Sequence, residues 1–157
     1  MNKNNRSTGF TLIELLIVVV IIAILAAVGY PVYNEHIKKS RRRDAQATLM
    51  ELSNAMERLH TRCSSYSSAV LGGNGTDCSS NGVFPNKAPL DGNRKYYSLS
   101  FLETPNTSAW KAMATPIGGQ AGDGCLLLFS TGERCWLAET TTCTTSVTCS
   151  TTGAVDW

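Results

Sequence analysis

An apolar run from Phe10 to Tyr30 constrains this chain more than any other feature of its sequence. As an α-helix rising about 1.5 Å per residue, the run would span roughly 30 Å, the thickness of the hydrocarbon core of a bilayer. From Leu12 to Val28 every residue is apolar except Glu14. A carboxylate at membrane depth is costly, so such a residue typically has a function. We therefore interpret residues 10–30 as a transmembrane helix that carries one functional acid, with a tolerated charge that snorkels to the interface as the alternative.

The segment before the apolar run is short, polar and basic. Residues 1–9 read MNKNNRSTG and include Lys3 and Arg6. A secretory signal peptide has a similar polar start, and Ala27-Val28-Gly29 could serve as its cleavage site. The apolar part of such a signal is usually only about 7–15 residues long, however. The length of the run and the presence of Glu14 therefore favour a retained membrane anchor over a disposable signal.

Helical periodicity resumes beyond a proline. Pro31 removes a backbone donor and its ring clashes with the carbonyl of Ala27, so we expect a kink at Gly29–Pro31. Residues 31–62 then form an amphipathic helix, because apolar residues recur at steps of three and four. The stripe consists of Ala45, Leu49, Leu52, Met56, Leu59 and Cys63. It predicts that this helix packs against a second layer.

The rest of the chain supplies that layer. Residues 63–94 are rich in Gly, Pro, Asn and Ser and are expected to form a loop. In residues 95–101 apolar and polar side chains alternate, which is typical of a half-buried strand. Further strands are expected at 109–115, 124–131 and 134–139, the last two joined by a turn at 131–133. We predict an α+β fold, with about four antiparallel strands (residues 95–139) packed on the helix and a Thr-rich tail (residues 140–157).

Six cysteines lie beyond the apolar run, none of them in a CxxC motif. An even number in a small, Ser/Thr-rich region indicates disulfides and an oxidising compartment such as the periplasm or the cell surface. Reduced, buried thiols are the alternative. Because the predicted hairpin and two short loops bring neighbours in sequence together, we expect local pairs. These are Cys63–Cys78, Cys125–Cys135 and Cys143–Cys149, with a moderate stabilising contribution from each.

The sequence offers no motif for catalysis or for a cofactor. His36 and His60 are not spaced with cysteines as a zinc site requires, and the glycine-rich stretches lack the context of a phosphate-binding loop, so we expect turns, no metal and no enzyme. The net charge is +2, yet residues 35–62 carry seven basic and four acidic side chains. The run Arg41–Arg43 could contact phosphates of DNA or of lipid headgroups, although a solvated helix face is the simpler interpretation. The three tryptophans are expected to pack in the core.

The N-terminal third resembles the class III signal of type IV pilins: a short basic leader ending in Gly, then FTLIELLIVVVIIAILAAVGYP. The resemblance implies cleavage between Gly9 and Phe10 by prepilin peptidase, and N-methylation of Phe10. It also implies that Glu14 faces the α-amino group of Phe10 on a neighbouring subunit in a helical filament. A buried polar pair of this kind fixes the axial register of an assembly, because an unpaired Glu14 would be penalised.

Later segments sharpen this resemblance to PilE-type minor pilins of Gram-negative bacteria. They are residues 39–66, YYSL (96–99), ATPIGGQAGDGC (114–125) and STGERCW (130–136). The tail does not match the usual short ending. The resemblance implies a minor structural subunit of the type IV pilus that supports pilus biogenesis, twitching motility and attachment. The alternatives are a pseudopilin of type II secretion and a DNA-uptake receptor.

The implied partners are other pilin subunits, prepilin peptidase, the assembly platform and the membrane, with nucleic acid not favoured. Orientation raises a conflict, because Lys38, Lys39 and Arg41–Arg43 follow the anchor, and the positive-inside rule alone would keep them in the cytoplasm. The cysteines favour the opposite orientation. We therefore expect the part of the chain that follows the anchor, the head, to lie in the periplasm before assembly and on a surface pilus afterwards.

Overall fold

The chain is described by a computed structural model that covers residues 10–75, 78, 82–138, 143, 149–150 and 154–157. It divides into two compact units, residues 1–37 and residues 38–157, and each is described by itself. One helix, α1 (Leu12–Cys63), contributes to both units. The proline at position 31 lies inside this helix and does not interrupt it. The kink predicted at Gly29–Pro31 stays a prediction.

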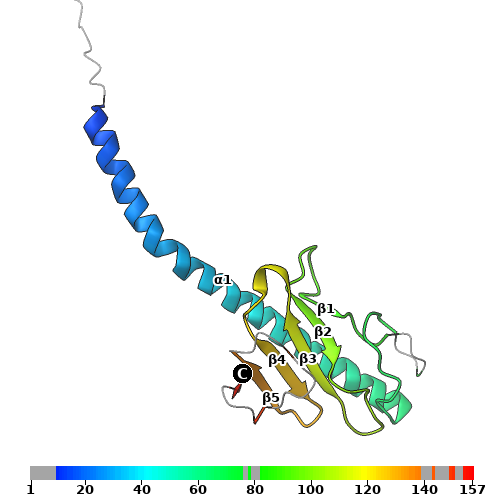
Figure 1. Ribbon diagram of the computed structural model, residues 1–157. Coiled ribbons are helices and arrows are strands. Elements are labelled where there is room, and N and C mark those ends of the chain that lie inside the picture. The colour runs from blue at the N-terminus through cyan, green and yellow to red at the C-terminus, as the bar shows by residue number, and fades with distance from the viewer. Residues whose placement is uncertain (1–9, 76–77, 79–81, 139–142, 144–148, 151–153) are drawn as a thin grey trace, which may run out of the picture. The chain divides into compact units, whose positions relative to one another are not determined.

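The second unit, residues 38–157, is called the head, and it packs the C-terminal half of α1 against a meander of six antiparallel strands (Figure 1). Along the sheet these strands are β1 (Lys87–Ala88), β2 (Tyr97–Phe101), β3 (Lys111–Pro116), β4 (Cys125–Phe129), β5 (Arg134–Leu137) and β6 (Ala154–Val155). A 3-10 turn, η1 (Gly118–Gln120), connects β3 to β4. The α+β fold is therefore confirmed, and so are the four strands that the sequence predicted. The expected number of strands was too low, because β1 and β6 have two residues each and show no periodicity.

The predicted stripe on α1 is buried. Its residues Leu49, Leu52 and Met56 are 0% exposed and lie in one core with Tyr97 and Leu126 of the sheet. The helix ends where Ser64 takes a φ of 52° and donates its backbone N–H to the carbonyl of His60 at 2.7 Å. This is a left-handed helix cap, so the chain leaves the helix into the loop that precedes the sheet.

Strand β4 is buried on both faces. Leu126 and Leu128 face the helix, while Cys125 and Leu127 belong to a second cluster with Met113 of β3. Cys143, Cys149 and Ala154 of the tail pack on this second cluster. These three residues therefore cover part of the sheet face that turns away from α1, which explains why β4 reads as a continuous apolar run rather than an alternating strand.

Candidate functional site

The start of α1 is closed by a reciprocal cap. The hydroxyl Oγ1 of Thr11 accepts from the backbone N–H of Glu14 at 3.3 Å, and both the N–H and the hydroxyl of Thr11 donate to Glu14 Oε2, at 3.4 and 3.2 Å. This is a capping box, in which a Thr and a Glu three residues later satisfy donors that the first helical turn leaves free. Glu14 therefore has a role within its own chain, which the sequence analysis missed although T-x-x-E is the signal for it.

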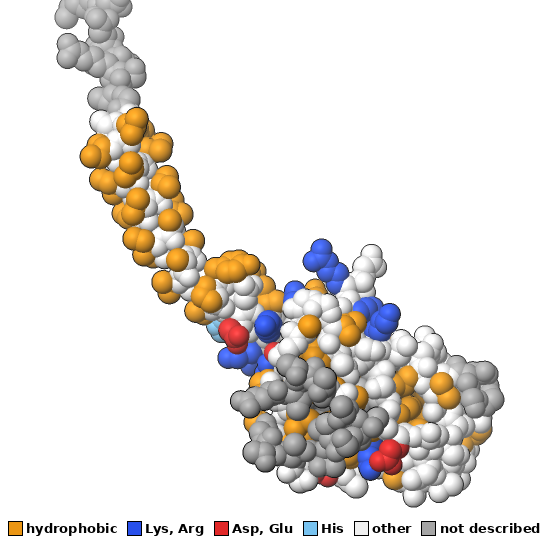
Figure 2. All heavy atoms as spheres, viewed as in Figure 1, with side chains coloured by type: hydrophobic (Ala, Val, Ile, Leu, Met, Phe, Trp, Pro, Cys, Tyr) orange, Lys and Arg blue, Asp and Glu red, His pale blue; other side chains and the backbone are white. Residues whose placement is uncertain are grey.

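The apolar part of α1 presents its side chains outward. The large hydrophobic residues from Phe10 to Tyr33 are each between 49% and 88% exposed, and Figure 2 shows apolar side chains over the visible surface of this segment. By length and composition α1 can cross a membrane, and its most apolar window of 18 residues is 0% buried. Such a surface requires lipid or other subunits around it. Phe10 and Glu14 lie at its start, while Gly9 lies outside the described residues, so its predicted cleavage is not tested.

A buried carboxylate joins α1 to the sheet. Asp123, in the loop before β4, accepts hydrogen bonds on Oδ2 from Arg42 Nε at 2.9 Å, from the Tyr97 hydroxyl at 2.7 Å and from Gln120 Nε2 at 2.9 Å. The terminal nitrogen Nη2 of Arg42 donates to the other carboxylate oxygen. Gln120 Nε2 also lies 3.0 Å from the carbonyl of Lys38, which accepts from it. We call Arg42, Tyr97, Gln120 and Asp123 the Asp123 clamp.

The clamp changes the ionisation of its members. Burial alone would raise the pKa of Asp123, but the hydrogen bonds from Arg42, Tyr97 and Gln120 outweigh it, and the pKa lies below its ordinary value of 3.8. Burial, followed by the hydrogen bond to the Asp123 carboxylate, raises the pKa of Tyr97 well above its ordinary value of 10.0. Asp123 is therefore ionised and Tyr97 neutral at physiological pH, and the hydrogen bonds of the clamp connect α1 to the sheet and to the loop before β4.

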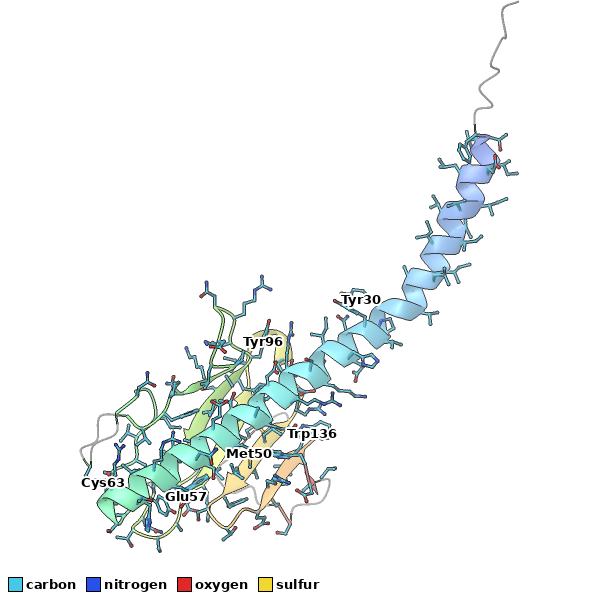
Figure 3. The ribbon with its side chains drawn as sticks, turned by 180° about the vertical axis from the view of Figure 1, so that it is seen from behind. Tyr30, Met50, Glu57, Cys63, Tyr96 and Trp136 are labelled. Atoms are coloured by element: carbon cyan, nitrogen blue, oxygen red, sulfur yellow. A yellow bond between two sulfur atoms is a disulfide. The ribbon has the colours of Figure 1, made fainter. Side chains whose placement is uncertain are left out.

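Two neighbouring arginines on α1 reach opposite sides of the helix. The guanidinium carbon of Arg41 lies 3.9 Å from the ring centre of Tyr96, and that of Arg42 lies 3.5 Å from the ring centre of Trp136. Figure 3 shows Tyr96 and Trp136 on either side of α1. Trp136 also donates its Nε1–H to the carbonyl of Asp123 at 2.7 Å. These contacts add cation–π attraction to the ion pair between Arg42 and Asp123, so residues 41 and 42 of α1 are held by aromatic side chains on two sides of the helix.

Gly124 lets the clamp approach the sheet. It has a φ of +83°, and a Cβ atom there would collide with the carbonyl oxygen of Leu137 in β5. Only glycine satisfies both demands, since the left-handed region and the close approach each disfavour a side chain. The stretch GDG at residues 122–124 is thus a turn, as predicted, and it positions Asp123.

The disulfides correct two of the three predicted pairs. Cys63–Cys78 is confirmed, with a Cα–Cα distance of 5.6 Å. The predicted pairs Cys125–Cys135 and Cys143–Cys149 are wrong, because the structure pairs Cys125 with Cys143 and Cys135 with Cys149. Cys125 stands opposite Leu137 in the ladder and Cys135 stands opposite Leu127, so these two cysteines are diagonal neighbours two residues out of register. Diagonal Cα atoms are roughly 7–8 Å apart, which is too far for a disulfide.

A run of positive charge opens the head. We call Lys38, Lys39, Arg41, Arg42 and Arg43 the basic helix segment. Within the described part of the chain, Arg42 is its one member with an ion pair, to Asp123. Lys39 and Arg43 are exposed and stand one helical turn apart on the same face. Lys39 and Arg43 therefore carry exposed positive charges that no carboxylate in the described part of the head pairs with.

Three points remain to be compared with the sequence: the tryptophans, a metal site and the Asp123 clamp. Trp110 and the partly buried Trp136 and Trp157 contribute to the core, as expected. The described residues contain no group of three His, Cys, Asp or Glu side chains that could hold a metal ion. The Asp123 clamp was missed entirely, since its members are separated by up to 81 residues and only the fold brings them together.

Comparison with protein families assigns both parts of the sequence. A family described as "Type IV minor pilin ComP, DNA uptake sequence receptor" matches residues 31–129. A second, described as "Prokaryotic N-terminal methylation motif", matches residues 4–30. The first match covers most of the head, and the second covers the leader and the apolar helix. No solved structure matches the chain.

Curated relatives resemble shorter stretches. The chain is 42% identical over 53 residues to "Prepilin peptidase-dependent protein D" of Escherichia coli (strain K12), which is 34% of this chain and 36% of that protein. It is 57% identical over 37 residues to "Fimbrial protein Q" of Moraxella bovis, 24% of each chain. It is 41% identical over 64 residues to "Type IV major pilin protein PilA" of Myxococcus xanthus (strain DK1622), 41% of this chain and 29% of that one. The chain thus spans about a third or less of the length of these relatives.

Proposed function

Since this chain belongs to the family of type IV minor pilins described as ComP, we propose that it acts as a minor structural subunit of the type IV pilus. The observation that carries the proposal is the pairing of a methylation motif at residues 4–30 with a minor-pilin head at residues 31–129. In this role the chain is anchored in the inner membrane, is processed by prepilin peptidase and moves into a filament. It performs no chemistry of its own.

The exposed helix supports the assembly step. A segment whose large side chains are all at least 49% exposed can exchange lipid for the same segments of neighbouring subunits without losing apolar contact. After cleavage before Phe10, a new ammonium group stands four residues from Glu14 in the chain. Within the chain, the capping box with Thr11 engages one oxygen of Glu14, Oε2. The other oxygen, Oε1, is left for the Phe10 ammonium of a neighbouring subunit. This pairing would select one axial register.

The head is built for an oxidising environment. Three disulfides tie the loop after α1 and the tail to the helix and the sheet. Such bridges persist in the periplasm and at the cell surface and are rare in the cytosol. We therefore propose that the head lies in the periplasm before assembly and on the filament afterwards.

Deletion of the gene tests the pilus role. We expect fewer surface pili and reduced twitching motility, both restored by the wild-type gene. Unchanged pili and twitching would contradict the role. Loss of exoprotein secretion with intact pili in the same strain would instead assign the chain to a secretion apparatus.

A second candidate function is DNA binding during uptake, and the description of the matching family favours it. The head offers suitable donors in Lys87 of β1 and Arg94 of the loop before β2, both exposed and without an ion pair among the described residues. Lysine and arginine side chains bind the phosphates of duplex DNA with an affinity that falls steeply with salt.

Titration of the full chain in nonionic detergent with duplex DNA tests this candidate. We expect binding at low salt, weakened by raising the salt and by Lys87→Gln/Arg94→Gln. Absence of binding at low salt would remove DNA from the functions of the chain and leave the pilus role intact.

A further inference from the structure

The basic helix segment has no assigned partner, and we propose that it binds the anionic headgroups of phospholipids while the chain resides in the membrane. This goes beyond the pilus role, although it rests on the membrane-anchored stage of that role. Three features that follow one another along α1 carry the proposal: the exposed apolar surface, two tyrosines, and four basic residues without a carboxylate partner among the described residues, of which Lys39 and Arg43 are exposed and Lys38 and Arg41 partly buried.

The end of the apolar surface is marked by two tyrosines. Tyr30 and Tyr33 are 71% and 64% exposed and follow the last purely aliphatic stretch of α1. Tyrosine prefers the boundary between hydrocarbon and water, where its ring is in apolar contact and its hydroxyl is wet. The headgroup layer therefore begins near Tyr33, only five residues before Lys38 in the chain.

The charges that follow are available to a ligand. The segment contains five basic residues, of which Arg42 is neutralised by Asp123 and largely buried, with its side chain 15% exposed. The guanidinium carbon of Arg41 lies over the ring of Tyr96, and no carboxylate in the described part of the chain forms an ion pair with it. Lys39 and Arg43 are exposed. Glu35 and Asp44 flank the segment, but neither forms an ion pair with it in the described part of the chain.

A cluster of four or more Lys and Arg residues immediately cytoplasmic of a membrane span is the usual sign of binding to anionic lipid, and the same attraction acts at any leaflet surface that carries anionic headgroups. Phosphate groups of the lipid would give Lys39 and Arg43 the counter-charges that the protein does not provide.

The test is native mass spectrometry of the full chain released from mixed micelles of phosphatidylglycerol and phosphatidylcholine, with the retained lipids identified and counted. We expect the wild-type chain to retain phosphatidylglycerol in preference. Lys39→Gln/Arg43→Gln should reduce this preference by about 25-fold, since each basic residue near a membrane surface contributes about fivefold. High salt should reduce the preference of the wild-type chain in the same direction.

Lys87→Gln/Arg94→Gln is the matched control, because it removes one Lys and one Arg from the same head. It should keep the wild-type preference for phosphatidylglycerol. The three disulfides of each variant are verified beforehand, so a folding defect is recognised separately. An equal loss in both double variants, wild-type preference in Lys39→Gln/Arg43→Gln, or no preference in the wild-type chain would each overturn the proposal.

Duplex DNA in place of lipid is the competing outcome. If Lys39→Gln/Arg43→Gln abolishes DNA binding and leaves lipid preference unchanged, the segment is a DNA contact and the proposal is wrong. The experiment uses purified protein, so its result is independent of the number of pili on the cell. A result that contradicts the pilus role can therefore be distinguished from one that contradicts lipid binding.

Discussion

The guanidinium group of Arg42 donates to both carboxylate oxygens of Asp123, a residue 81 positions further along the chain. This pair connects the first turns of the head helix to the loop before the central strand β4. The two side chains are only 15% and 6% exposed. If one partner is removed, water therefore cannot replace the hydrogen bonds and the counter-charge that the other loses. This arrangement stabilises the head.

Asp123→Asn should lower the free energy of unfolding of the head by about 3 kcal/mol, because it leaves the buried guanidinium of Arg42 without a counter-charge. Thermal unfolding of the full chain in nonionic detergent, followed by tryptophan fluorescence, measures this. The control is Asp156→Asn, which removes the carboxylate of an exposed pair with Arg134 at 3.7 Å. It should cost under about 1 kcal/mol. Equal effects of the two substitutions would show that the Asp123 clamp contributes no more than a surface pair.

The clamp also sets an acid limit for the head. The pKa of Asp123 is lowered on folding, so its contribution to stability is fully present above its ordinary value of 3.8 and is lost as the pH falls through the lower folded value. The difference in unfolding free energy between wild type and Asp123→Asn should therefore be constant from pH 7 to about pH 5 and shrink below about pH 4. Urea titrations across this range measure it. A difference that persists unchanged at pH 2 would contradict the assignment.

The disulfide pattern is directly measurable. Proteolysis without reduction should yield peptides that join Cys125 to Cys143 and Cys135 to Cys149, and none that joins Cys125 to Cys135. Cys143→Ser should cost about 3 kcal/mol of stability, since it opens a closed loop of 18 residues. It should leave Cys125 as a free thiol, because the register of β4 and β5 keeps Cys135 out of reach. Recovery of a Cys125–Cys135 peptide would refute this register.

Glu14 is predicted to act in assembly through its charge and in its own helix through its cap. Glu14→Gln retains an oxygen that accepts from Thr11 but removes the negative charge, whereas Glu14→Ala removes both. Both variants should reach the membrane and be processed normally, because loss of a charge favours insertion. Both should be depleted from sheared filaments by about tenfold or more, since the Phe10 ammonium would stay unpaired in an apolar core. If the Glu14→Gln variant enters filaments at wild-type levels, the charge of Glu14 has no role in assembly, and the helix cap is the role that remains.

The sequence was sufficient for the parts of the fold that rest on periodicity. The stripe from Ala45 to Leu59 and the alternation in β2 each predicted an element and its buried face, and the structure confirms both. The two-residue strands β1 and β6 carry no such signal. The pairing of Cys125 failed for a related reason, because a shift of two residues in register decides it and no local pattern reports that shift.

The N-terminal candidate residues carry a local sequence signal, whereas the Asp123 clamp in the head carries none. Glu14 is conspicuous because it interrupts an apolar run, and the leader before Phe10 is a local motif. The Asp123 clamp has no local motif: Arg42 looks like one of several basic residues, and Asp123 looks like part of a turn. Only the packing of α1 on the sheet makes them partners.

The intact mass of the protein recovered from sheared pili tests the central claim most directly. If the chain is a processed subunit of the pilus, its mass will equal that of residues 10–157 with one added methyl group and six fewer hydrogens for three disulfides. A chain that is absent from purified filaments, or one that is present with its leader uncleaved, would contradict the claim.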